Sequence, residues 1–113
     1  MGILKKIGFL LTSFFVIIFA SSAHAALSQD IGQIAELYVN ETGQIAIKLS
    51  GGFLNAIATN QCPANNGYAG NTTANNAFKA ALLTAKAMGN NVRVSILSCD
   101  GTWFRIVDVY ILQ

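Results

Sequence analysis

The sequence predicts a small, mainly β domain of the α+β class, with five strands, one helix and one disulfide. Short runs in which apolar and polar residues alternate, as in residues 44–50, are typical of half-buried strands. One longer segment, residues 74–88, has its apolar residues at helical spacing. Two cysteines, Cys62 and Cys99, lie among these segments.

Residues 1–25 have the pattern of a secretory signal peptide. Lys5 and Lys6 precede a short apolar run, and small residues lead to a cleavage site after Ala25. The run is shorter than the roughly 20 apolar residues that a membrane-spanning helix needs, although an uncleaved anchor is the alternative. We therefore expect a mature domain of residues 26–113, secreted or periplasmic, with no membrane span.

The first half of the domain is predicted to contain three strands. Residues 34–40 and 44–50 read as two strands, and the glycine-containing connection 41–43 favours a hairpin between them. A weaker third strand is expected over residues 53–59. Residues 60–76, rich in Asn, Gly, Thr and Ala, are predicted to form a long loop.

The predicted helix runs from Ala74 to Met88. Thr73 is the predicted N-cap, and Gly89 is the predicted end of the helix. One face should pack on the strands; it carries Phe78, Ala81, Leu82, Ala85 and Met88. The opposite side is apolar as well, with Ala80, Leu83 and Ala87, while Lys79 and Lys86 flank it. Either the outer face of such a helix packs against a second partner, or its alanines are present only because alanine favours helix formation.

Two strands complete the domain, over residues 92–98 and 103–112, joined by a turn at residues 99–102. In an oxidising compartment Cys62 and Cys99 should form one structural disulfide, because their spacing is unlike that of a redox pair. The chain-entropy model gives this bond a value of roughly 4 kcal/mol.

Charge and composition exclude several functions. Without Lys5 and Lys6, five of the seven basic residues remain, and they are balanced by five acidic residues. Such a domain lacks the basic surface that nucleic acid requires. The only histidine, His24, lies in the predicted leader, so the domain has no imidazole for a Ser-His pair or for zinc. The sequence thus predicts a protein without catalysis, metal or cofactor.

The order of three strands, one helix and two strands is that of a small five-stranded OB-fold barrel with the helix between strands three and four. Two parts of the sequence also resemble a known family. The first is residues 32–38 followed by 42–44, and the second is a longer pattern after them. The longer pattern is Cys62, Asn65-Asn66, Tyr68, Ala77-Phe78, Leu82, Ala85, Gly89-Asn90 and Val92-Arg93-Val94. Together they resemble the B subunit of subtilase cytotoxin and its relatives in typhoid-type and pertussis-like toxins.

The resemblance implies a secreted subunit that assembles as a ring of five, with its helices lining a central pore. It also implies binding of sialylated host glycans and association with a separate catalytic A subunit. On this basis Lys79, Leu83 and Lys86 would face neighbouring subunits or the pore. The family's sialic-acid serine falls near Asp30 or Ile31 here, and the pairing of Cys99 is not the family's.

The leading hypothesis is a glycan-binding subunit that is not an enzyme. Its candidate contacts combine aromatic faces with amide and charged groups: Asp30, Tyr38, Asn65, Asn66, Tyr68, Trp103 and Arg105. Each has a plainer interpretation: Tyr38, for example, can be a packing residue and the two asparagines turn residues. The alternative function is a secreted or periplasmic protein-interaction module, such as an inhibitor or assembly accessory.

Overall fold

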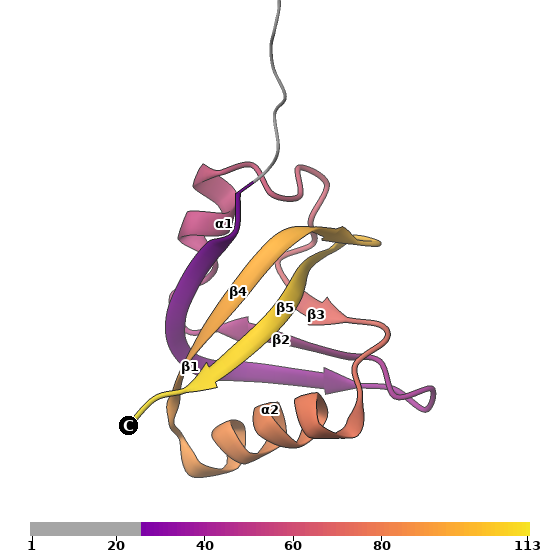
Figure 1. Cartoon of the computed structure of the whole chain (residues 1–113), viewed down its shortest axis with the longest axis vertical. Helices are drawn as coiled ribbons and strands as arrows, with labels where there is room; N and C mark the ends of the chain where they lie inside the picture. The colour runs from indigo at the N-terminus through magenta and orange to yellow at the C-terminus, as the bar shows by residue number, and fades with distance from the viewer. Residues whose placement is uncertain (1–25) are drawn as a thin grey trace, which may run out of the picture.

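The computed structural model describes residues 26–113, so the predicted leader and its cleavage site lie outside the described residues. The domain is mainly β, as predicted, but it contains two helices instead of one (Figure 1). Its elements in chain order are β1 (Ser28–Val39), β2 (Ile45–Leu49), α1 (Leu54–Ala58), β3 (Ala69–Asn71), α2 (Asn76–Met88), β4 (Asn91–Asp100) and β5 (Trp103–Ile111).

The five strands form one mixed sheet that closes on itself in the order β1-β2-β3-β5-β4. The long strand β1 closes the ring because its first half, residues 28–33, pairs with β4 and its second half with β2. All pairs are antiparallel except β3 with β5. The helices α1 and α2 lie at opposite ends of this ring (Figure 1).

The interior is filled by the inward side of each strand. Ile45, Ile47 and Leu49 alternate with outward residues on β2 and are buried, as their period of two predicts. Leu82 and Ala85 of α2 are fully buried against the same core. The main hydrophobic cluster is completed by apolar residues of the other elements: Ile34, Phe53, Ala56, Cys62, Ala69, Val92, Val94, Ile96, Phe104 and Ile106.

The prediction of a strand over residues 53–59 is wrong, because this segment forms the short helix α1. Its backbone is capped from a distant strand: the Asp30 carboxylate accepts hydrogen bonds from the N–H groups of Asn55 (2.8 Å) and Ala56 (3.1 Å). Phe53 and Ala56, three positions apart, turn inward to the core. The helix thus depends on a partner that local sequence does not reveal.

The third strand lies instead inside the segment predicted as a loop. β3 has only three residues, and they pair with β2 on one side and β5 on the other. Side chains fasten its end: Asn71 Nδ2 donates to the carbonyl of Ile106 (3.0 Å), and the Thr72 N–H donates to Asp100 (2.8 Å). Because its pairing comes from two other strands, β3 shows little strand signal of its own.

The helix α2 confirms the predicted stop and shifts the predicted start. Asn75, not Thr73, is the N-cap, and its side chain accepts the N–H of Phe78 (2.9 Å). Gly89 ends the helix in the left-handed conformation, with φ 69°. Met88, predicted to pack on the strands, is 69% exposed because it lies in the last turn, beyond the core.

The predicted disulfide between Cys62 and Cys99 is present, with 5.0 Å between the two Cα atoms. It joins the loop after α1 to the end of β4, and it fits a protein of the periplasm or the extracellular space. Within residues 26–113, no helix is long and apolar enough to cross a membrane. The same residues contain no group of three or more His, Cys, Asp or Glu side chains that could hold a metal ion.

Candidate functional site

The candidate site lies on the outer side of the sheet, over two small residues that are neighbours in register. Ala46 of β2 pairs with Tyr38 of β1 on one side and with Gly70 of β3 on the other. Ala46 is fully buried although it is not part of the main hydrophobic cluster. Larger side chains that rise around it therefore cover it from outside, and the small residues form the floor of a hollow.

Aromatic rings form the walls of this hollow. Tyr38 and Trp103 meet edge to face, with 5.9 Å between ring centroids and 72° between ring planes. A cavity of about 310 Å³ lies beside this pair, lined by Tyr38, Asn66, Tyr68 and Trp103. The residues come from β1, the loop before β3 and the start of β5, so the fold brings together segments that are far apart in sequence.

Gly70 allows the Trp103 ring to lie close to the sheet. A Cβ atom at this position would stand 2.7 Å from Trp103 Cε3 and 2.7 Å from Ala46 Cβ, and it would also collide with the Ile45 carbonyl oxygen. No side chain fits in that space without displacing backbone. The glycine is therefore required by close packing at the floor of the cavity.

Tyr68 forms another wall and is held by two charged residues. Its hydroxyl donates a hydrogen bond to Glu36 Oε1 at 2.6 Å, and Lys48 Nζ lies 4.7 Å from the ring centroid. The hydrogen bond to Glu36, followed by desolvation and the negative charge of Glu36, raises the pKa of Tyr68 above its ordinary value of 10.0. The phenol therefore remains neutral and acts as a donor to Glu36.

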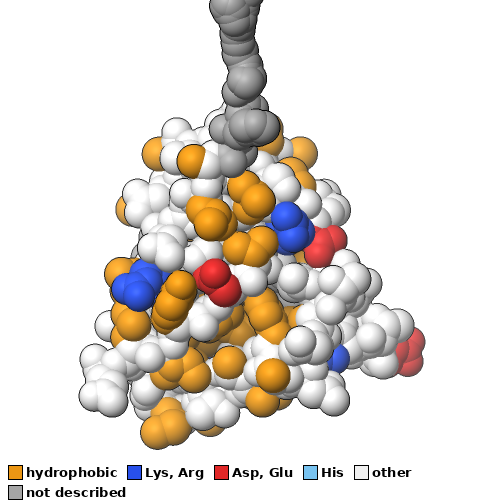
Figure 2. All heavy atoms as spheres, viewed as in Figure 1, with side chains coloured by type: hydrophobic (Ala, Val, Ile, Leu, Met, Phe, Trp, Pro, Cys, Tyr) orange, Lys and Arg blue, Asp and Glu red, His pale blue; other side chains and the backbone are white. Residues whose placement is uncertain are grey.

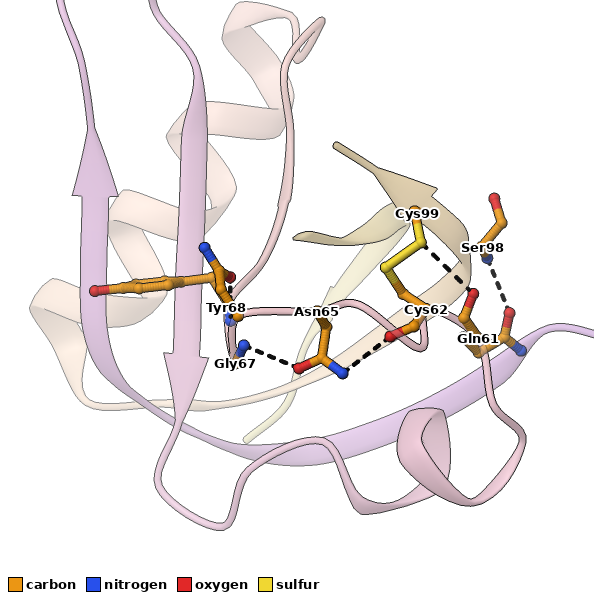
Figure 3. Close-up of a disulfide and its surroundings, with 8 residues drawn as sticks. Gln61, Cys62, Asn65, Gly67, Tyr68, Ser98 and Cys99 are labelled. Atoms are coloured by element: carbon orange, nitrogen blue, oxygen red, sulfur yellow. Dashed lines mark hydrogen bonds between the residues drawn. A yellow bond between two sulfur atoms is a disulfide. The ribbon is translucent and has the colours of Figure 1, made fainter. Parts of the chain in front are cut away.

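The loop that carries Asn66 and Tyr68 is ordered by its own side chains (Figure 3). Asn65 spans the turn: its Nδ2 donates to the Cys62 carbonyl (2.9 Å), and its Oδ1 accepts the N–H of Gly67 (2.9 Å). Asn66 Oδ1 accepts the N–H of Tyr68 at 3.2 Å. The disulfide at Cys62 anchors the start of this loop, as Figure 3 shows.

The loop is also joined directly to the strand that carries Trp103. The backbone N–H of Asn66 donates to the carbonyl of Thr102 at 2.9 Å, and the N–H of Phe104 donates to the carbonyl of Tyr68 at 3.0 Å. Trp103 lies between these two bonds in sequence. The walls of the cavity therefore belong to one connected unit.

Four of the predicted ligand contacts, Tyr38, Asn66, Tyr68 and Trp103, line the cavity together. Asn65 is not among the lining residues and is the turn residue described above. Arg105 is the next outward position after Trp103 on β5, opposite Gly70 in register, and it is not among the lining residues.

Asp30 requires a correction. Its side chain is only 6% exposed, and both carboxylate oxygens accept hydrogen bonds from the first turn of α1. A carboxylate used in this way stabilises the fold and is not free for a ligand. Its predicted role in glycan binding is therefore replaced by a capping role.

The three residues predicted to face neighbours or a pore lie on α2. Leu83 is 48% exposed, Lys86 Nζ lies 3.4 Å from the carbonyl oxygen of Ala35, and Lys79 is half-buried. They belong to the end of the ring that α2 covers and do not take part in the cavity.

Several residues of the site were not predicted from sequence. Glu36 and Lys48 hold Tyr68, while Ala46 and Gly70 form the floor. The signal for Glu36 was its position two residues before Tyr38, since alternate residues of a strand lie on one side. The same rule places Ala46 and Lys48 together on the outer side of β2.

Figure 2 shows few charged side chains on the visible face of the domain, and they are scattered among apolar and neutral ones. The fold and the cavity define a small, disulfide-linked, mainly β domain with an aromatic-walled surface site. No protein-family model, curated protein or solved structure matches the chain.

Proposed function

We propose that the chain is a secreted, non-catalytic subunit that binds a sugar residue of host cell-surface glycans in the cavity between Tyr38, Asn66, Tyr68 and Trp103. The aromatic cavity is the observation that carries the proposal. Sugar rings present an apolar face and a rim of hydroxyl groups, and the cavity offers aromatic surfaces beside an amide. Its volume of about 310 Å³ is at the lower end of small-ligand sites, which is consistent with one sugar ring.

The strand order supports the further proposal that the domain is an OB-fold. In that fold, oligosaccharides and oligonucleotides bind on the face of strands 2 and 3, near the loop between strands 4 and 5. Ala46 and Gly70, the floor of the cavity, belong to β2 and β3, and Trp103 directly follows the β4–β5 turn. The balanced charge of the domain favours sugars over nucleic acid as the ligand.

The resemblance to toxin B subunits adds a proposal about assembly. The outer side of α2 carries exposed Ala80, Leu83 and Ala87. We propose that this side contacts neighbouring copies in a ring of five, which would make weak sugar binding multivalent. A catalytic A subunit would be the partner of such a ring.

The experiment is a glycan array probed with the oxidised domain, residues 26–113, followed by titration of each bound sugar. Trp103 is the only tryptophan, so its fluorescence reports on the cavity directly. Tyr38→Ala should weaken binding about tenfold or more, because it removes an aromatic anchor worth at least about 1.4 kcal/mol. The matched control is Tyr110→Ala, since Tyr110 is exposed to the same degree (45% against 44%) but lies at the far end of β5.

Binding that falls in Tyr38→Ala and persists in Tyr110→Ala supports the proposal. An array without bound glycans contradicts it and favours the protein-interaction module. Equal effects of the two variants, or no effect of either, contradict the cavity as the binding site.

A further inference from the structure

Tyr68 is one wall of the cavity, and its backbone alone does not fix the orientation of its side chain. It lies in the loop before β3, its side chain is half-buried, and its ring is not part of the hydrophobic core. A phenol in this position would rotate about two side-chain bonds in solution. A ligand that needs the ring in one orientation would then bear the entropic cost of ordering it.

Two residues on neighbouring strands remove this freedom. Glu36 of β1 and Lys48 of β2 are paired in register, so their side chains leave the sheet side by side. Glu36 holds the end of the Tyr68 ring through the 2.6 Å hydrogen bond from the hydroxyl, and the Lys48 ammonium lies over the ring face at 4.7 Å. The hydrogen bond to Glu36 fixes the direction in which the ring points, and the Lys48 ammonium fixes the tilt of the ring plane.

The loop leaves space for this arrangement. Gly67, with φ 91°, has no side chain, and a Cβ atom there would already stand in contact with Lys48 Cε at 3.8 Å. The lysine chain therefore runs past the turn to reach the tyrosine. Neither Glu36 nor Lys48 is among the residues that line the cavity.

We infer that Glu36 and Lys48 are positioning residues, which set the affinity of the cavity by holding Tyr68 in place without contacting the sugar themselves. The inference rests on the proposed function for its ligand, but the hydrogen bond that carries it is testable without one. Loss of one immobilising contact should weaken binding about two- to tenfold, the range expected for ordering one side chain.

The first experiment follows the ionisation of Tyr68 by the ultraviolet absorbance of phenolate, in a Tyr38→Phe/Tyr110→Phe background where Tyr68 is the only remaining tyrosine. Because the hydrogen bond to Glu36 and the negative charge of Glu36 raise the pKa of Tyr68, Glu36→Ala, which removes both, should lower the ionisation midpoint towards its ordinary value. Glu41→Ala, which removes an exposed carboxylate from the β1–β2 turn, should leave the midpoint unchanged. An unchanged midpoint in Glu36→Ala would overturn the inference, whatever the ligand.

The second experiment is a double-mutant cycle with a sugar found on the array, read by Trp103 fluorescence. Glu36→Ala should weaken binding about two- to tenfold, Glu36→Gln should weaken it less because the amide oxygen still accepts the hydroxyl, and Glu41→Ala should not weaken it. In a Tyr68→Ala background, Glu36→Ala should have no further effect, since it acts only through Tyr68.

A loss that persists in the Tyr68→Ala background overturns the inference, because Glu36 would then contact the sugar itself. The two proposals also fail separately. If the wild-type domain binds no sugar, the proposed function falls, and the Tyr68 titration still decides whether Glu36 holds the ring.

Discussion

Replacing Gly70 by alanine tests whether the floor of the cavity is as closely packed as the structure describes. The added Cβ atom would meet Trp103 Cε3 and Ala46 Cβ at 2.7 Å each, well below ordinary carbon–carbon contact, and would also overlap the Ile45 carbonyl. Two of these partners belong to the backbone or are fixed directly to it, so only the Trp103 ring is able to move.

The expected cost is at the upper end of the range for overpacking, about 3 kcal/mol of unfolding free energy. For a domain of this size that corresponds to a fall in Tm of roughly 12 to 24 °C. Strand β3 has three residues and joins β2 to β5, so displacement there loosens both pairings. In the folded fraction, the Trp103 ring should move outward and become more accessible to a fluorescence quencher.

The measurement is thermal and urea unfolding of the oxidised domain, with Gly51→Ala as the matched control. Gly51 is exposed, and no atom lies within 4 Å of the position that a Cβ would take there, so its replacement should change stability by less than about 0.5 kcal/mol. If Gly70→Ala has the same Tm and unfolding free energy as Gly51→Ala, the Trp103 ring does not rest on β3, and the described floor of the cavity is wrong.

Two further predictions concern the disulfide and α2. Cys62→Ser/Cys99→Ser should lose about 4 kcal/mol of unfolding free energy, because the bond closes a separation of 37 residues. Urea unfolding measures this loss. The wild type in the presence of a dithiol reductant should have the same unfolding free energy as the variant. Equal stability of the oxidised and reduced wild type would contradict the expected loss. If the proposed ring of five forms through α2, Leu83→Lys should reduce the native mass in light scattering from that of five chains to that of one, whereas Leu54→Lys, on the exposed side of α1, should not. A monomeric wild type would refute the ring.

The strands and the helix with strong periodicity were predictable from sequence. Alternation at Ile45, Ile47 and Leu49 identified β2, and Gly89 marked the end of α2 correctly. The failures occur where distant partners decide the local structure. Residues 53–59 form a helix because Asp30 caps it from β1, and β3 is a strand because β2 and β5 lie on either side of it.

For the candidate site, single residues could be predicted from sequence, but their arrangement in space could not. Tyr38, Asn66, Tyr68 and Trp103 were predicted from their chemistry alone, since aromatic and amide side chains suit sugars. Their common location depends on the register between strands, which no local pattern contains. For that reason the contribution of Gly70 could not be predicted: a glycine in a loop-like segment gives no sign that a tryptophan will lie against it.

The division of β1 between two partners has a consequence for how the protein is made. Residues Ser28–Gln33 pair with Asn91–Ile96, segments more than half the chain apart. The sheet cannot close until the ribosome has completed β4, so early native pairing is limited to β1 with β2 and the three-residue β3 with β2, and isolated pairs of this kind are marginally stable. Until β4 has been made, most of the chain therefore lacks the partners that its folded state requires.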